Sequence, residues 1–220
     1  MAVRTPFKTT QMSKKENAQF AEKNLAKLYP DIGVHLDYEN AYTLLIAVLL
    51  SAQCTDKRVN MVTPKLFALA STPQKMLKLG QKKIAEIIHS CGFFNAKSAN
   101  IVKLSQTLVD EYNGEVPQNM RALESLAGVG HKTASVVMMQ AFGVPTFPVD
   151  THIHRLAKRW KLSSGKDVET TEKDLKKLFP QETWNKLHLR LIQYGRDYCK
   201  AHTCKTKETL CPLCKKFNAL

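Results

Sequence analysis

The chain has 220 residues, of which 33 are lysine or arginine and 19 are aspartate or glutamate, so its formal net charge is +14. Hydrophobic residues make up 44% of the sequence, which is enough to bury a core and excludes a generally disordered chain. This length predicts one large domain or two small ones. The positive charge predicts a polyanionic partner, and nucleic acid fits it better than an anionic membrane surface does.

Targeting and membrane signals are not expected from this sequence. The first 20 residues carry basic side chains but lack the apolar stretch of a secretory signal. The longest apolar run, residues 44–50, is too short to span a bilayer. We therefore expect a cytoplasmic protein, associated with the nucleoid if it is bacterial, with a basic arm at its N-terminus.

Helical periodicity runs through almost the whole chain, and no segment shows convincing strand alternation. Ser13 is the expected N-cap of the first helix, and residues 41–52, apolar on all sides, predict a buried central helix. Pro64 is expected to interrupt the next segment, and Thr72-Pro73 to begin another helix. Later apolar stripes bring the total to about ten short helices, so the sequence predicts an all-α fold.

Residues 126–134 read LAGVGHKTA and lie between two helical stripes. Gly128 and Gly130 both tolerate a positive φ, so we expect a sharp hairpin here. Backbone N–H groups at the N-terminus of the following helix bind phosphate without regard to base sequence. In a chain of charge +14 this pattern predicts a contact with a DNA backbone, whereas the simpler interpretation is a plain tight turn.

This segment resembles the helix-hairpin-helix of the DNA glycosylase superfamily, and residues 149–152 (VDTH) resemble the downstream aspartate motif of that superfamily. Three further stretches resemble the endonuclease III family: residues 49–56 (LLSAQCTD), residues 92–97 (GFFNAK), and the Gly-Arg pair that leads into Cys199. The resemblance implies an all-α, two-domain fold with DNA in the cleft between the domains. Its implied segments are 1–33, the basic arm and an N-terminal helix packing with the C-terminal domain; 34–144, a six-helix domain with the hairpin; and 145–220, a C-terminal helical domain with an iron–sulfur loop.

The resemblance places the family's catalytic lysine at Lys132 and its catalytic aspartate at Asp150. A primary amine that attacks C1′ of a damaged nucleotide forms a Schiff base, which allows β-elimination of the 3′ phosphate. An ordinary lysine is neutral in only about one molecule in a thousand at pH 7, so this chemistry needs a base or a lowered pKa. Without the resemblance, the sequence predicts only that Lys132 is a surface lysine and that Asp150 is the N-cap of the helix that follows it.

The resemblance also assigns contacts with DNA. It implies that Gln53 enters the space left by the flipped nucleotide and that Phe93 wedges into the opposite strand, which offsets part of the cost of extrusion. Phe93 has a competing interpretation as a core residue beside Phe94. The remaining expected DNA-binding residues lie in the hairpin segment: Leu126, Gly128, Val129, Gly130 and Thr133.

Four of the six cysteines fall in the last 22 residues, which favours a metal site over a disulfide framework. Their spacing is C-x4-C-x6-C-x2-C, whereas the family pattern is C-x6-C-x2-C-x5-C. We still expect Cys199, Cys204, Cys211 and Cys214 to hold a structural [4Fe–4S] cluster, with zinc or no metal as the alternatives. Cys54 and Cys91 are expected to be ordinary buried thiols.

The function implied by the resemblance is that of a monomeric base-excision repair enzyme acting on damaged duplex DNA. It would remove oxidised pyrimidines as a DNA glycosylase and nick the abasic strand as an AP lyase. One alternative is a monofunctional adenine or mismatch glycosylase, which needs no amine and carries an extra domain for which the sequence leaves no room. The other is a non-enzymatic DNA-binding protein built on the hairpin.

Overall fold

The structure is a computed structural model that describes residues 13–202, 204, 206 and 208–217. These residues form eleven α-helices and one short 3-10 helix, and none of them lies in a strand. The expected all-α fold is thereby confirmed. The first twelve residues, which carry the expected basic arm, lie outside the described part of the chain.

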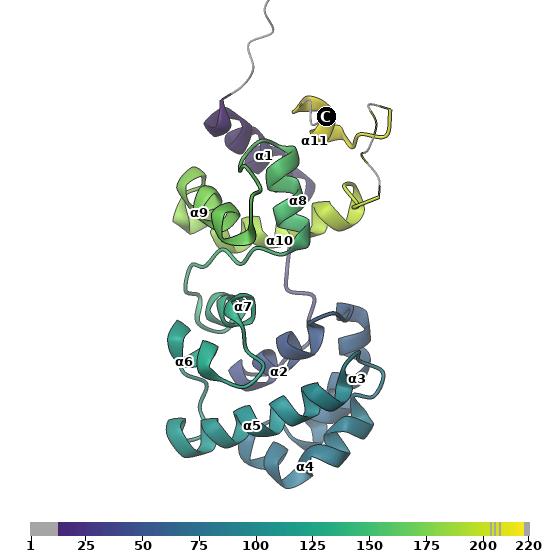
Figure 1. The fold of residues 1–220 in the computed structure, drawn as a ribbon, viewed down its shortest axis with the longest axis vertical. Helices are drawn as coiled ribbons and strands as arrows, with labels where there is room; N and C mark the ends of the chain where they lie inside the picture. Colours follow the sequence, from purple (N-terminus) through teal and green to yellow (C-terminus); the bar gives the residue numbers. More distant parts are fainter. Residues whose placement is uncertain (1–12, 203, 205, 207, 218–220) are drawn as a thin grey trace, which may run out of the picture. The chain divides into compact units, whose positions relative to one another are not determined.

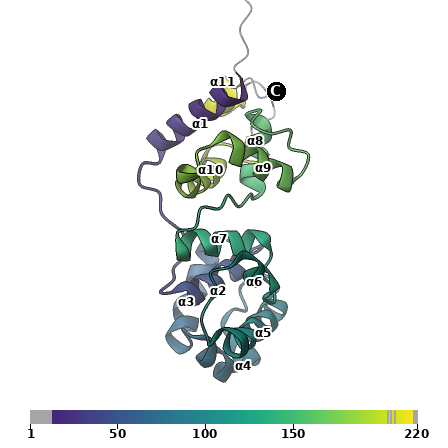
Figure 2. The same ribbon diagram turned by 90° about the vertical axis from the view of Figure 1, so that its left-hand side faces the viewer.

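The helices belong to two compact units, which can be followed by label and colour in Figures 1 and 2. One unit is the continuous segment Gly33–Pro148. The other combines the chain up to Ile32 with the chain from Val149 onward, so both ends of the sequence contribute to it. The segment boundaries implied by the resemblance, after residues 33 and 144, stay a prediction.

The unit Gly33–Pro148 is built on the apolar helix α2 (Ala41–Ser51), in which every residue from Tyr42 to Leu50 is buried. Burial on all sides explains why this helix has no polar face. Asn40 caps it, because the Asn40 side chain accepts the backbone N–H of Thr43 at 2.9 Å. Five helices complete the unit: α3 (Asp56–Leu69), α4 (Pro73–Ile87), α5 (Phe94–Tyr112), α6 (Met120–Ser125) and α7 (His131–Phe142).

The sequence predicted that Pro64 would interrupt a helix, and this prediction is wrong. Helix α3 continues through Pro64 to Leu69. A proline inside a helix costs about 3 kcal/mol, since it removes one hydrogen bond and crowds the preceding turn. The helix persists because one of its faces is buried in the core, including Val59, Val62 and Leu66. In α4 the predicted start at Thr72 and Pro73 is confirmed.

The second unit contains α1 (Lys14–Leu28), α8 (Thr151–Arg159), α9 (Val168–Leu178), η1 (Gln181–Thr183), α10 (Trp184–Asp197) and α11 (Pro212–Lys216). Helix α10 contacts both α1 and α8. The indole ring of Trp160 lies 5.4 Å from the ring of Tyr194 and 5.5 Å from that of Phe217, so three distant segments share one aromatic core. The expected Ser13 cap of α1 is confirmed. Across the described residues, no helix has the length and apolar character needed to cross a membrane.

Candidate active site and metal centre

The glycine-containing segment forms a tight hairpin between α6 and α7. Gly128 adopts a φ of +77°, whereas Gly130 is extended with a φ of −93° and acts as the N-cap of α7. Only the first glycine therefore needs the left-handed conformation. Gly130 has no side chain to cap α7, and the first N–H groups of a helix have no partner within the helix. The hairpin thus has the backbone geometry of an anion-binding helix N-terminus.

The two apolar residues of the hairpin turn inward. Leu126 is 2% exposed and Val129 is 5% exposed, and both pack in the core of their unit. The N–H of Val129 donates to the carbonyl of Leu126 at 3.1 Å and closes the turn. A contact of either residue with DNA would therefore involve backbone groups and not the side chain.

Lys132 is the second residue of α7 and has an exposed side chain, and the partly exposed Thr133 follows it. Beside them, the imidazole Nδ1 of His131 lies 2.7 Å from Oε1 of Glu124, which links α7 to α6 across the hairpin. An amine in the first turn of α7 is thus placed directly after the candidate phosphate-binding backbone.

Asp150 is the N-cap of α8, and its Oδ1 accepts the backbone N–H of Ile153 at 2.8 Å. The capping interpretation is therefore correct as a description of the local structure. Capping uses one carboxylate oxygen, and a carboxylate has two that accept hydrogen bonds. Nearby, burial lowers the pKa of His152, and the charge of Asp150 partly opposes this shift. Asp150 and Lys132 belong to different units.

Gln53 and Phe93 are both exposed and both adopt a left-handed backbone, with φ values of +53° and +56°. Phe93 is 67% exposed, so the core interpretation of this residue is wrong; Phe94, not Phe93, packs against the core. An exposed phenylalanine in a strained conformation is unusual for a purely structural residue. The two residues lie in the same unit.

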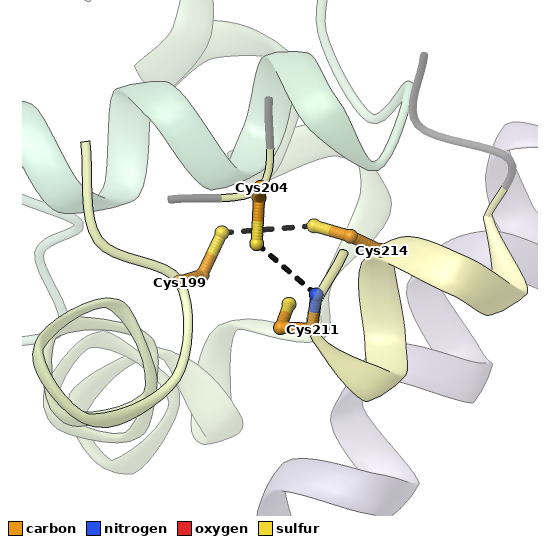
Figure 3. A group of neighbouring side chains, drawn as sticks. All are labelled: Cys199, Cys204, Cys211 and Cys214. Carbon is orange, nitrogen blue, oxygen red and sulfur yellow. Dashed lines mark hydrogen bonds between the residues drawn. The ribbon is translucent and has the colours of Figure 1, made fainter. Parts of the chain in front are cut away.

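The four C-terminal cysteines converge on one point despite their unusual spacing (Figure 3). All four are buried, and their Sγ atoms lie within 4.8 Å of one another. The Sγ atoms of Cys199 and Cys214 are 3.6 Å apart. The backbone N–H of Cys211 donates to Cys204 Sγ at 3.1 Å, so the loop itself stabilises one of the sulfurs. Cys54 and Cys91 lie in the other unit, where Cys91 is buried as expected and Cys54 is partly buried.

Two side chains from the helices donate hydrogen bonds to this group of sulfurs. The guanidinium Nη1 of Arg159 lies 2.9 Å from Cys199 Sγ, and the hydroxyl of Tyr194 lies 3.2 Å from Cys211 Sγ. Burial alone would lower the pKa of Arg159, but the hydrogen bond to Cys199 and the nearby thiols outweigh it and raise that pKa. These two donors favour negatively charged sulfur at Cys199 and Cys211, whereas the hydrogen bond with the Cys211 thiol raises the pKa of Cys199 to about 11.

Comparisons with known proteins agree with one another. A family model described as HhH-GPD superfamily base excision DNA repair protein matches residues 46–181. Endonuclease III of Haemophilus influenzae is 46% identical over 185 residues, which are 84% of this chain and 85% of that protein. Endonuclease III of Escherichia coli K12 is 44% identical over the same shares of both chains. The chain belongs to the endonuclease III family.

Solved structures of endonuclease III support the same assignment. A trapped endonuclease III–DNA covalent intermediate matches with a TM-score of 0.85 and 41% identity, over 93% of this chain and 99% of that chain. A non-covalent endonuclease III–DNA complex matches with the same score and identity. A thermostable thymine-DNA glycosylase, at 22% identity and a TM-score of 0.80, shares the fold.

Membership of the endonuclease III family confirms the function expected from the sequence. The protein is a base-excision repair enzyme, a bifunctional DNA glycosylase and AP lyase for oxidised pyrimidines. The two alternatives, a monofunctional adenine or mismatch glycosylase and a non-enzymatic DNA-binding protein, are not supported by these comparisons.

The four cysteines fit the [4Fe–4S] cluster of the endonuclease III family. Iron–sulfur clusters of this type are held by four thiolates, and the site offers four buried sulfurs without a nitrogen or oxygen ligand among them. The cluster would be structural, because its four ligands lie in one short tail that it would hold together. The departure from the family spacing does not prevent the four sulfurs from meeting.

Sequence reasoning missed the two donors of the cysteine site and the burial of Lys97. From the sequence, Arg159 is interpreted as an ordinary basic residue at the end of a helix. Tyr194 is interpreted as part of an apolar stripe. Lys97 stands in the GFFNAK stretch that carries the resemblance, yet nothing in the sequence shows that its side chain is buried. A signal was present for Arg159: it lies four residues after Arg155 on the same face of α8, and Arg155 donates a hydrogen bond to the carbonyl of Cys199.

Proposed function

We propose that Lys132 is the nucleophile and Asp150 the carboxylate of this reaction, on damaged duplex DNA. The observation that carries the proposal is the position of Lys132 in the first turn of α7, directly after the Gly128–Gly130 hairpin. A phosphate bound by the backbone N–H groups of that turn would place the sugar of the same nucleotide near an amine.

The chemistry follows from these two groups. The neutral amine of Lys132 attacks C1′, and the damaged base departs with the bonding electron pair and takes up a proton. The bond between C1′ and O4′ then breaks, O4′ takes up a proton, and the nitrogen and C1′ form a Schiff base. Loss of a proton from C2′ then expels the 3′ phosphate, and water releases the amine from the nicked product.

Asp150 is proposed to accept the proton that the attacking amine loses, or to stabilise the cationic character that develops at C1′. A carboxylate serves both tasks, and an amide of the same shape serves neither. Its capping bond to Ile153 holds the carboxylate in one orientation, so the structural role and the chemical role support each other. The hairpin residues, Thr133 included, together with Gln53 and Phe93, are proposed to bind the duplex around the extruded nucleotide.

A covalent trapping experiment tests the proposal. The protein is incubated with a duplex that contains one oxidised pyrimidine, in the presence of borohydride, which reduces a Schiff base to a stable amine. We expect a protein–DNA adduct, and peptide mapping should locate the attached sugar on Lys132. An adduct on another residue would remove Lys132 from the mechanism, and strand cleavage without any adduct would contradict a Schiff base.

We further propose that the enzyme acts as a monomer in the cytoplasm and that it is associated with the nucleoid. Its substrate, duplex DNA, and its bacterial relatives support this location. Sedimentation of the free protein and of its DNA complex tests the oligomeric state. A protein-to-DNA ratio of two on a short duplex with one lesion would contradict the monomer.

A further inference from the structure

Lys97 makes hydrogen bonds to both of the segments that carry Gln53 and Phe93. Its backbone N–H donates to the carbonyl of Phe93 at 2.9 Å, as the first bond of α5. Its side-chain Nζ donates to the carbonyl of Leu50 at 2.8 Å, three residues before Gln53. Since Lys97 is only 6% exposed, a single buried residue joins two segments that are about 40 positions apart in sequence.

A buried ammonium group loses hydration, and its surroundings compensate for this loss only in part. Leu50 lies in the last turn of α2, where the final carbonyl groups have no partner within the helix and carry partial negative charge. Burial lowers the pKa of Lys97, and the neighbouring thiols of Cys54 and Cys91 oppose that shift. Packing alone does not require a charge here, because an apolar side chain of similar length would fill the same space.

The two segments also lie close together, and both are strained. A Cβ placed on Gly92 would lie 3.6 Å from the carbonyl oxygen of Gln53. Gln53 and Phe93 both hold a left-handed backbone, which costs free energy for any residue other than glycine. Such conformations persist only where the surrounding structure fixes them. The bond from Lys97 to Leu50 supplies part of that restraint.

We propose that Lys97 is a positioning residue that holds Gln53 and Phe93 as one rigid unit, so that both side chains enter the duplex together when the damaged nucleotide is extruded. The inference rests on the proposed roles of Gln53 and Phe93. Filling the two gaps in the duplex offsets the cost of extrusion only to the extent that the side chains are already in place. Removing the Lys97 bond leaves both side chains present and lets them move independently.

The test compares Lys97→Met, which keeps the length of the side chain and removes the donor, with Lys103→Met, an exposed lysine on the same helix. Single-turnover excision is measured on an oxidised pyrimidine in a paired duplex and on the same lesion inside an unpaired bubble. We expect Lys97→Met to lose about tenfold in rate on the paired duplex and much less on the bubble, where extrusion costs less. Lys103→Met should match the unaltered protein on both substrates.

A double-mutant cycle measures the coupling itself. Gln53→Ala and Phe93→Ala are made singly and together, with Lys97 present and in the Lys97→Met background. We expect the effects of Gln53→Ala and Phe93→Ala on the excision rate to be non-additive with Lys97 present. In the Lys97→Met background we expect them to be additive. If Lys97→Met does not fold, Lys97→Arg, which keeps the charge and shifts the donor, replaces it and should show the same preference for the bubble substrate.

Different results separate the two levels of the proposal. Equal losses on the paired and unpaired substrates, or additive effects with Lys97 present, would overturn the role of Lys97. Unaltered activity of Gln53→Ala and Phe93→Ala on the paired duplex would instead overturn the proposed roles of those two residues. The same set of variants yields both results.

Discussion

Arg159 donates a hydrogen bond from Nη1 to Cys199 Sγ at 2.9 Å and so connects the last residue of α8 to the candidate cluster site. One turn earlier on the same helix, Arg155 Nη2 donates to the carbonyl of Cys199 at 2.7 Å. Helix α8 begins at its cap, Asp150, so one short helix connects the cysteine site to the proposed catalytic carboxylate.

Replacement of Arg159 should weaken the binding of the cluster at the four cysteines. We expect Arg159→Met to lose iron to a chelator about tenfold faster than the unaltered protein, because a hydrogen bond between charged groups contributes about 1.5–3 kcal/mol. Bleaching of the visible absorption follows the loss. Arg159→Lys keeps the charge, so its rate of iron loss should lie between those of Arg159→Met and the unaltered protein. Arg121→Met, at an exposed position in the other unit, is the control. Identical bleaching in all four proteins would show that the bond is unimportant.

The identity of the metal is decided by composition and colour. We expect the protein, purified without oxygen from iron-replete cells, to be yellow-brown with about four irons per chain. Replacing any one of Cys199, Cys204, Cys211 or Cys214 by serine should lower the iron content and destabilise the C-terminal segment. A colourless protein with one tightly bound zinc would establish the zinc alternative. A metal-free tail that proteases cut readily would establish that the cysteines hold no metal.

The helices were predictable because their signals are local. Ser13, Thr72 and Pro73 mark helix starts within a few residues of sequence, and apolar periodicity gives the buried faces. Contacts between distant residues carry no such signal. The bond from Lys97 to Leu50 spans 47 positions, and that from Arg159 to Cys199 spans 40. For the same reason the spacing of the cysteines gave no account of how their loop closes, since Tyr194 on a separate helix helps to hold Cys211.

The two hairpin glycines should respond differently to the same substitution. Gly128→Ala places an alanine at a φ of +77°, and its Cβ would lie 2.7 Å from Nδ2 of Asn100. Since a left-handed conformation costs about 1–2 kcal/mol, we expect its Tm to fall by several degrees. Gly130→Ala meets open space at an ordinary φ, so its Tm should fall much less than that of Gly128→Ala, by the small cost of replacing a glycine N-cap with alanine.

DNA affinity adds a second comparison between these variants. Both methyl groups lie at the proposed phosphate-binding backbone, so both should reduce binding to undamaged duplex, which is measured by fluorescence anisotropy at fixed salt. Reduced affinity in Gly130→Ala at a nearly unchanged Tm would support a direct approach of DNA to this turn. Full affinity in that variant would indicate that the turn only shapes the fold.

Lys132→Ala should separate binding from chemistry. We expect it to lose the borohydride-trapped adduct and strand cleavage entirely, because alanine offers no amine to form the Schiff base. Affinity for duplex should fall only slightly, since backbone groups and many other cations contribute to phosphate binding. Lys82→Ala, another exposed lysine in the same unit, is the matched control. Normal trapping by Lys132→Ala would assign the nucleophile to a different residue.

Asp150→Asn and Asp150→Ala together separate the cap from the chemistry. Asparagine caps a helix about as well as aspartate, so Asp150→Asn should keep its Tm, whereas alanine loses the bond to Ile153 and about 1 kcal/mol, or roughly 2–4 °C for a chain of this size. Both variants lack the carboxylate, so both should excise the damaged base about a hundredfold more slowly in single-turnover assays. An active Asp150→Asn beside an unstable Asp150→Ala would make Asp150 a cap alone. A slow Asp150→Asn with an unchanged Tm is the result that assigns the carboxylate to the reaction.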